Sequence, residues 1–204
     1  MSRTPLLLAT TNAGKVREIR KALKGLPLSV RGLGDVPSGA VYRERGASFA
    51  ANARGKSLFY SRRWPGLTLA EDSGIEIDAL GGAPGVRSAR FSSPKPSDEK
   101  NNRKVLRLLR AVPPPGRAAR YVCVMALAMD GLILKELRGE VRGRIGLAPR
   151  GRSGFGYDPI FYYPPLRRTF AELDPAAKNR VSHRGRALRK LIRFLEARSR
   201  SSNR

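Results

Sequence analysis

The sequence predicts an α/β fold. Short apolar runs that suit buried strands alternate with stretches of helical periodicity, and glycine or proline separates most of these segments. The 204 residues give the length of one α/β domain or of two small lobes. A chain of this size can bury roughly 70% of its unfolded surface, so it can build its own core.

The first third of the chain alternates between strand and helix. Residues 5–10 predict a strand, and residues 11–15 predict a turn into a helix that either Thr11 or Asn12 caps. Residues 28–33 predict a second strand. The apolar face of the first helix consists of Val16, Ile19, Leu23 and Leu26.

The middle third continues this pattern. Residues 48–63 predict a helix, residues 67–71 a buried strand, and residues 75–77 a half-exposed strand. A glycine-rich loop follows at residues 81–85. Ser97 is expected to cap a helix with apolar positions at Val105, Leu106 and Leu109.

Two long strands and a helix make up the last third. Residues 120–129 and 132–141 meet at Asp130-Gly131, a strong hairpin signal, and this hairpin is a candidate for a lobe of its own. Residues 199–204 have nothing to bury and are expected to be a disordered basic tail. The last helix carries its apolar stripe at Leu188, Leu191, Ile192 and Leu195.

The charge balance of the chain is unusual. Lysine and arginine number 41 against 16 aspartate and glutamate residues, for a formal net charge of +25. Such a balance favours polyanions, so nucleic-acid binding is one hypothesis. The basic residues are dispersed and accompany no recognisable nucleic-acid module, which favours the alternative of a solvated basic surface.

The cysteine content and the apolar runs indicate the cellular compartment. Cys123 is the only cysteine and lies in a strand-like run, so we expect a buried thiol and neither a disulfide nor a thiolate metal cluster. No apolar stretch has the length of a signal peptide or approaches the ~20 residues of a membrane span. We therefore expect a soluble protein of the cytoplasm.

Residues 64–86 contain no lysine or arginine, although 41 of the 204 residues are basic. Mg²⁺ prefers oxygen ligands, usually one or two carboxylates together with substrate phosphates. This segment therefore indicates a magnesium site. A buried strand that excludes lysine is the alternative, which explains the missing basic residues but not the carboxylates. The segment has four of them, Glu71, Asp72, Glu76 and Asp78.

Two further segments suggest ligand binding. Residues 10–15 join a strand to a helix, where backbone N–H groups, the helix dipole and Lys15 favour a phosphate, although such a turn can also be purely structural. Phe155 lies between two glycines, which let a flat ligand stack on its ring unless the segment is an ordinary turn. His183 is the only histidine and is available for hydrogen bonding or proton transfer, with a cap or core position as the alternative.

Taken together, these motifs resemble those of the inosine triphosphate pyrophosphatase family. The resemblance runs from about Leu6 to Leu195. It rests on motifs in the family's order and spacing, at residues 9–15, 48–56, 71–86, 154–161, 169–173 and 178–185.

The resemblance implies a fold, a reaction and a cofactor. The fold would be a mixed, elongated β-sheet flanked by helices, forming one domain of two lobes over residues 1–198, with the active-site cleft between the lobes. The enzyme would hydrolyse ITP, dITP or XTP to the monophosphate and pyrophosphate, and so keep these nucleotides out of DNA and RNA. It would use Mg²⁺ and form a homodimer.

The resemblance also implies site residues. Asp72 would be the general base and a metal ligand, and Glu44 the second metal carboxylate. Phe155 would stack on the base, with Asp158, His183 and Arg184 reading its polar edges. The full set of substrate-binding residues would be Thr10, Thr11, Asn12, Ala13, Gly14, Lys15, Lys56, Ser73, Phe155, Gly156, Tyr157, Asp158, Lys178, His183 and Arg184.

The sequence departs from the family pattern in places. Ala51 stands where relatives commonly have glutamate, near the metal or the helix start. Gly55 lies inside a predicted helix, where an apolar residue is usual. A pyrophosphatase that prefers modified pyrimidines and a nucleic-acid-binding protein are the rival hypotheses.

Overall fold

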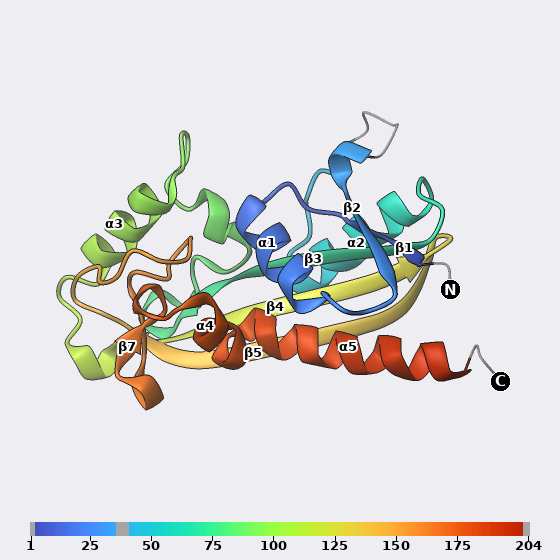
Figure 1. Ribbon diagram of the computed structural model, residues 1–204. Helices are drawn as coiled ribbons and strands as arrows, with labels where there is room; N and C mark the ends of the chain where they lie inside the picture. Colours follow the sequence, from blue (N-terminus) through green and yellow to red (C-terminus); the bar gives the residue numbers. More distant parts are fainter. Residues whose placement is uncertain (1–2, 36–40, 202–204) are drawn as a thin grey trace. The chain divides into compact units, whose positions relative to one another are not determined.

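A mixed β-sheet runs through the described part of the chain. The computed structural model describes residues 3–35 and 41–201, and across these residues the seven strands follow the order β2-β1-β3-β4-β5-β6-β7 (Figure 1). β1 pairs in parallel with both β2 and β3, whereas β6 pairs antiparallel with both β5 and β7. The predicted α/β class, with a mixed sheet flanked by helices, is therefore confirmed.

The strands are β1 (Thr4–Leu8), β2 (Leu28–Gly32), β3 (Leu67–Ile77), β4 (Ala118–Met129), β5 (Leu132–Ile145), β6 (Phe161–Tyr163) and β7 (Arg168–Thr169). The α-helices are α1 (Ala13–Ala22), α2 (Phe49–Ser61), α3 (Asp98–Leu108), α4 (Pro175–Val181) and α5 (His183–Ser201). Short 3₁₀ helices are η1 (Leu33–Asp35), η2 (Asp78–Leu80), η3 (Gly85–Arg90), η4 (Pro114–Gly116), η5 (Pro164–Leu166) and η6 (Phe170–Glu172).

The helix starts agree with the capping residues of the sequence. The side chain of Asn12 accepts a hydrogen bond from the Lys15 backbone N–H at 3.0 Å, so Asn12 rather than Thr11 is the N-cap of α1. Ser48 caps α2 and Ser97 caps α3 through their side chains in the same way. These caps satisfy N–H groups that the first helical turn leaves without a partner.

β3 is one strand of 11 residues, although the sequence predicts two strands separated by residues 72–74. Polar side chains usually interrupt a buried strand, but here they have partners. The amide of Asn52 donates to Asp72, and the guanidinium of Arg184 donates to Ser73. The strand therefore continues through this polar stretch.

The β4–β5 hairpin is confirmed, but its predicted role as a separate lobe is wrong. Its two turn residues, Asp130 and Gly131, have φ angles of 50° and 77°, and positive φ at both positions is typical of a type I′ turn. β4 and β5 occupy central positions in the sheet, and residues 121–128 of β4 are all buried. A strand that is apolar on both faces needs cover on both sides, which a separate hairpin cannot supply.

α5 continues to Ser201, so the prediction of a disordered tail from Ser199 is wrong for residues 199–201. The helix extends beyond Leu195, its last buried leucine, because adding residues to an existing helix is far easier than starting one. Residues 202–204 of the predicted tail lie outside the described residues.

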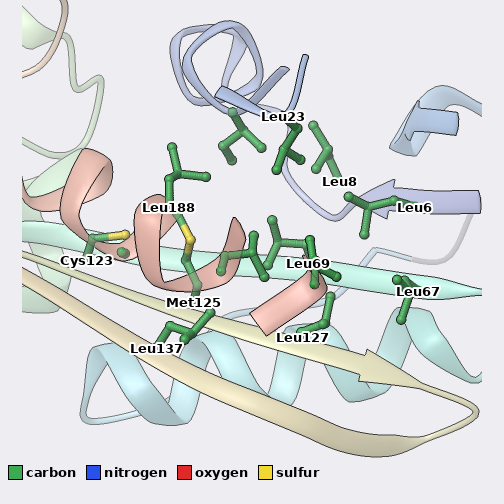
Figure 2. Packing of buried hydrophobic residues seen from close by; sticks show 14 residues of the cluster. Leu6, Leu8, Leu23, Leu67, Leu69, Cys123, Met125, Leu127, Leu137 and Leu188 are labelled. Carbon is green, nitrogen blue, oxygen red and sulfur yellow. The ribbon is translucent and has the colours of Figure 1, made fainter. Parts of the chain in front are cut away.

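The chain divides into two compact units. The first consists of Met1–Asp72, Cys123–Gly139 and Gly185–Arg204. Its main core joins leucines of the sheet, such as Leu69, to Leu23 beside α1 and to Leu188 of α5 (Figure 2). Fully burying one such side chain contributes about 1.5–3 kcal/mol.

Both faces of β1 are buried in this unit. Leu6 and Leu8 belong to the core that includes α1 and α5, whereas Leu7 between them packs in a separate cluster with Tyr60 of α2. Side chains alternate across a strand, so helices must cover both faces of this parallel part of the sheet. Cys123 is fully buried in the first of these clusters, as predicted.

The second unit consists of Ser73–Val122 and Glu140–Arg184. Its core is aromatic, and the ring centroids of Tyr121 and Phe161 lie 4.7 Å apart. Val105 of α3 packs against the same cluster. Within residues 3–35 and 41–201, no helix is long and apolar enough to cross a membrane.

Candidate active site

The turn between β1 and α1 presents backbone N–H groups at a helix N-terminus. Oδ1 of Asn12 accepts a hydrogen bond from the N–H of Lys15, and the N–H of Asn12 donates to Oγ1 of Thr10 at 3.2 Å. The turn is therefore held by its own side chains. The hydrogen-bond pattern of an α-helix leaves the N–H groups of Ala13 and Gly14 without an acceptor in the helix. This arrangement suits an anion such as a phosphate.

The side chain of Lys15 reaches from this turn to a buried carboxylate. Its Nζ lies 3.0 Å from Oε1 of Glu71, whose side chain is 1% exposed. The second oxygen of Glu71 accepts a hydrogen bond from the thiol of Cys123 at 3.7 Å. The Lys15 side chain stays 15% exposed, so Glu71 holds a cation that solvent can still reach.

Asp72, the next residue along β3, is held by Asn52. Its Oδ2 accepts a hydrogen bond from Nδ2 of Asn52 at 2.9 Å, and Oδ1 of Asn52 accepts the Gly46 N–H at 2.7 Å. A Cβ on Gly46 would lie 2.6 Å from that oxygen, so glycine allows this close approach. Asn52 is thus bound at both ends of its amide and fixes the orientation of Asp72.

The surroundings of Asp72 shift its protonation. Burial raises the pKa of Asp72 above its ordinary value, because a low-dielectric site disfavours the charged carboxylate. The hydrogen bond from Asn52 and the charges of Lys15 and Lys56 oppose this rise in pKa, whereas the negative charge of Glu44 adds to it. A carboxylate with a raised pKa is a better proton acceptor and is common at catalytic positions.

A glycine in α2 shapes the segment that carries Glu44. Lys56 of α2 donates a hydrogen bond to Oε1 of Glu44. Its neighbour Gly55 costs the helix ~1 kcal/mol relative to alanine. A Cβ on Gly55 would overlap the hydroxyl of Tyr42, so the glycine makes room for Tyr42 against the helix. We refer to Lys15, Glu44, Asn52, Lys56, Glu71 and Asp72 as the carboxylate–lysine cluster.

In the second unit, Asp158 organises the glycine-rich loop. Its Oδ2 accepts the Phe155 backbone N–H at 2.9 Å and the Nζ of Lys178 at 2.6 Å. Asp158 is 2% exposed and Lys178 is 5% exposed, so this is a buried ion pair. Gly154 has a φ of +83°, and a Cβ on it would overlap the Asp158 carboxylate.

The loop places the ring of Phe155 close to two cations. The Nζ of Lys178 lies 4.7 Å from the ring centroid, and the Cζ of Arg184 lies 5.4 Å from it. Both distances suit cation–π attraction. The ring is only partly buried, so a flat ligand has room to stack on it.

Two side chains of α3 hold the peptide groups of Gly156. Oδ2 of Asp98 accepts the Gly156 N–H at 2.7 Å, and Nδ2 of Asn102 donates to the Gly156 carbonyl oxygen at 3.1 Å. Asp98 and Asn102 are four residues apart and therefore lie on the same face of the helix. They fix the backbone immediately after Phe155.

Buried contacts also hold His183 and Arg184. The His183 ring stacks on Tyr121, with ring centroids 4.4 Å apart and an angle of 5° between the ring planes. The hydroxyl of Tyr121 accepts the Tyr157 N–H at 3.1 Å, and Nη2 of Arg184 donates to Oγ of Ser73 at 3.0 Å. We refer to Ser73, Tyr121, Phe155, Asp158, Lys178, His183 and Arg184 as the aromatic–cation cluster.

The two clusters lie in a chain that matches a known protein family. The model of the Ham1 family matches residues 6–194. The chain belongs to the Ham1 family. The predicted resemblance to the inosine triphosphate pyrophosphatases is thereby confirmed.

Individual Ham1 relatives match along almost their whole length. A dITP/XTP pyrophosphatase of Gloeobacter violaceus is 47% identical over 188 residues, which cover 92% of each chain. One from Desulforamulus reducens is 45% identical over 190 residues, covering 93% of this chain and 94% of the relative. The structure of a HAM1 protein from Coxiella burnetii has a TM-score of 0.85 at 38% identity, covering 95% of this chain and 99% of that protein.

The predicted Ham1 site residues fall into both clusters. Lys15, Lys56, Asp72 and Glu44 lie in the carboxylate–lysine cluster. Thr11, just before α1, and Ala13, its first residue, are both exposed. Tyr157 is a core residue whose hydroxyl donates to the Ser88 carbonyl oxygen at 2.7 Å. The predicted residues that lie in the aromatic–cation cluster are Ser73, Phe155, Asp158, Lys178, His183 and Arg184. Gly156 belongs to the loop beside this cluster.

Several positioning residues of this Ham1 chain were missed by the sequence reasoning. Asn52 lies in a family motif, but nothing in its spacing shows that it binds Asp72. Asp98 and Asn102 share a helix face, which could have marked them, yet their target is 54 to 58 residues away in the chain. Tyr121 is indistinguishable from other apolar positions of a buried strand.

Proposed function

We propose that this chain hydrolyses non-standard purine nucleoside triphosphates, such as ITP, dITP and XTP, to the monophosphate and pyrophosphate. Relatives of 45% and 47% identity that are named dITP/XTP pyrophosphatases support this reaction and substrate class. The observation that carries the proposal is the buried Asp72 carboxylate, fixed by Asn52 and influenced by two lysine charges. Removing such nucleotides keeps them out of DNA and RNA.

The phosphates are bound by the first unit in this proposal. The N–H groups in the first turn of α1 and the two lysines, Lys15 and Lys56, supply donors and positive charge for a triphosphate. Each lysine is already held by a carboxylate, Glu71 or Glu44, so the charges are oriented before the substrate arrives. Preorganised charge of this kind stabilises a transition state without rearrangement.

Asp72 acts as the general base. It orients a water molecule and takes its proton as the water oxygen attacks the α-phosphorus. The bond between the α-phosphorus and the bridging oxygen breaks, and pyrophosphate leaves with the electron pair. Lys15 and Lys56 balance the charge on the leaving group, and loss of one such contact costs on the order of 10²-fold or more in rate.

Asp72 and Glu44 are the residues that would hold Mg²⁺. Within the described residues, no three His, Cys, Asp or Glu side chains are grouped to bind a metal ion. A pair of carboxylates fits Mg²⁺, which binds one or two of them and completes its shell with phosphate oxygens and water. Glu44 raises the pKa of Asp72, as expected for two carboxylates near one another. When bound, the ion would neutralise phosphate charge.

The base is recognised by the aromatic–cation cluster. Phe155 provides the stacking surface, and His183 and Arg184 donate to the polar edge of the base. A 6-oxo purine presents an acceptor where adenine presents an amino donor, so a donor-rich site leaves the adenine group unpaired. Asp158 orients the loop and Lys178, and Ser73 holds Arg184. The clusters adjoin in sequence at the peptide bond between Asp72 and Ser73.

The proposal includes the assembly and location of the enzyme. The active form is a homodimer, as the family resemblance implies. It works in the cytoplasm, where free nucleoside triphosphates are found.

Product analysis tests the proposal. The purified chain is incubated with dITP, XTP, dATP, dGTP and dTTP, with Mg²⁺ and then with excess EDTA. We expect dIMP and pyrophosphate from dITP only when metal is present, and far slower hydrolysis of dATP. Equal hydrolysis of all five nucleotides, or release of inorganic phosphate in place of pyrophosphate, would contradict the proposed function.

A further inference from the structure

The outer side of α5 carries a row of exposed cations. Arg186, Arg189, Lys190, Arg193 and Arg200 are all exposed and recur at helical spacing. The opposite side of the helix is apolar and belongs to the core of the first unit, through Ala187, Leu188, Leu191 and Leu195. Figure 1 shows α5 as the long straight helix at the C-terminal end of the chain.

α1 contributes a second group of exposed cations. Arg17, Arg20 and Lys21 of α1, and Lys24 just after it, are all exposed. Ile19 on the other side of this helix packs into the same core cluster as Leu188 of α5. The cations therefore lie on the solvent side of helices that share one core. We refer to these four residues and the five of α5 as the α1–α5 basic face.

We propose that the α1–α5 basic face binds the phosphate backbone of double-stranded nucleic acid without sequence preference. At 1.5 Å per residue, the row from Arg186 to Arg200 is about 21 Å long. Duplex nucleic acid has one negative charge per ≈1.7 Å of helix axis with both strands counted, so a duplex carries roughly a dozen phosphates over this length. A single nucleotide could meet only a small part of such a row.

The chemistry of the face favours nucleic acid over a lipid surface. A helix that binds a membrane surface inserts an exposed apolar face, but Leu188, Leu191 and Leu195 are already buried in the core. Four of the five cations that α5 contributes to the face are arginines, whose planar guanidinium groups bind phosphate oxygens in pairs. Only two carboxylates lie on α1 and α5 as described, Glu18 and Glu196.

The basic face is separate from the proposed hydrolysis. None of its nine residues belongs to the carboxylate–lysine cluster or the aromatic–cation cluster. Binding and hydrolysis should therefore respond to different substitutions. The proposal also accounts for part of the +25 net charge, which pyrophosphatase chemistry alone does not require.

The test compares two variants with equal loss of charge. In one, Arg186→Gln, Arg189→Gln and Arg193→Gln remove three cations from the face. In the control, Arg103→Gln, Arg107→Gln and Arg110→Gln remove three exposed cations from the α3 region of the second unit. Fluorescence anisotropy with labelled duplex RNA and duplex DNA measures affinity from 50 to 200 mM salt, over which a protein with several phosphate contacts loses roughly 10³-fold or more. Circular dichroism and dITP hydrolysis check each variant's fold.

We expect the wild-type chain and the control to bind both duplexes, and the face variant to bind at least about 10-fold more weakly. Its slope of log affinity against log salt should fall by about 3, since each phosphate contact contributes ≈0.9. Three outcomes would overturn the proposal: no duplex binding by the wild type, equal losses in both variants, or binding only to vesicles of anionic phospholipid. A second variant, Lys190→Gln with Arg200→Gln, should weaken binding in the same direction while dITP hydrolysis stays unchanged.

Discussion

Replacing Asp72 with asparagine should abolish hydrolysis and preserve the fold. Asparagine has nearly the same shape, and its carbonyl oxygen can still accept the hydrogen bond that Nδ2 of Asn52 now makes at 2.9 Å. The amide cannot take a proton from water. Loss of a general base costs about 10²–10⁴-fold in rate, which corresponds to roughly 2.7–5.5 kcal/mol of barrier.

The same substitution should not lower stability at neutral pH. Burial raises the pKa of Asp72, so the stability that its neutral carboxyl contributes is present below the unfolded pKa and is lost as pH rises through the folded pKa. An amide in this position stays neutral at every pH. Asp72→Asn should therefore melt at or above the wild-type temperature at pH 7, and this difference should shrink on acidification toward the unfolded pKa.

Asp72→Ala separates charge from hydrogen bonding. Alanine leaves the buried Asn52 amide without its partner, which costs about 1–3 kcal/mol. For a chain of this length, that corresponds to a decrease of roughly 2–12 °C in Tm. Initial rates of dITP hydrolysis and thermal melts of both variants are the assays. If a well-folded Asp72→Asn enzyme kept more than a tenth of the wild-type rate, the role of Asp72 as base would be refuted.

Four further predictions follow from the same structure. The acid limb of kcat/KM for dITP should titrate above the ordinary aspartate pKa, because burial raises the pKa of Asp72; a limb at or below that pKa would contradict this. Phe155→Ala should raise KM for dITP while leaving the inhibition constant of inorganic triphosphate unchanged, whereas Phe155→Tyr should behave like the wild type. Asn102→Ala removes the hydrogen bond to the Gly156 carbonyl oxygen, which contributes roughly 0.5–1.5 kcal/mol, and should raise KM for dITP about 2–10-fold with little change in kcat. An equal effect on inhibition by triphosphate would argue against a role in base binding. Gly55→Ala should lower Tm despite the better helix propensity of alanine, because its Cβ overlaps Tyr42. In a Tyr42→Ala background, adding Gly55→Ala should no longer lower Tm.

The sequence predicts best where short-range chemistry decides the structure. The side chain of Asn12 caps α1 by accepting a backbone N–H only three residues along the chain, and Asp130-Gly131 fixes a turn by its own backbone preferences. The apolar stripe of α5 needs only helical periodicity to be found. Asp72, Lys15 and Phe155 were singled out from local composition and turn patterns, and the family resemblance then gave them their roles; the sequence does not show their contacts.

Long-range contacts account for what the sequence did not reveal. The uninterrupted β3 depends on partners for Asp72 and Ser73 that lie 20 and 111 residues away. The hold of Asn102 on the glycine-rich loop is likewise visible only in three dimensions. Gly55 reads as a helix defect in sequence, and its reason, the packing of Tyr42, lies outside the helix. Such pairings have no local signature.

Isotope labelling identifies the phosphorus atom that water attacks. The chain hydrolyses dITP in water enriched in oxygen-18, and mass spectrometry determines which product carries the label. Attack of water on the α-phosphorus, with Asp72 as base, predicts one labelled oxygen in dIMP and unlabelled pyrophosphate. Label in pyrophosphate or in inorganic phosphate would show attack at another phosphorus and contradict hydrolysis at the α-phosphorus.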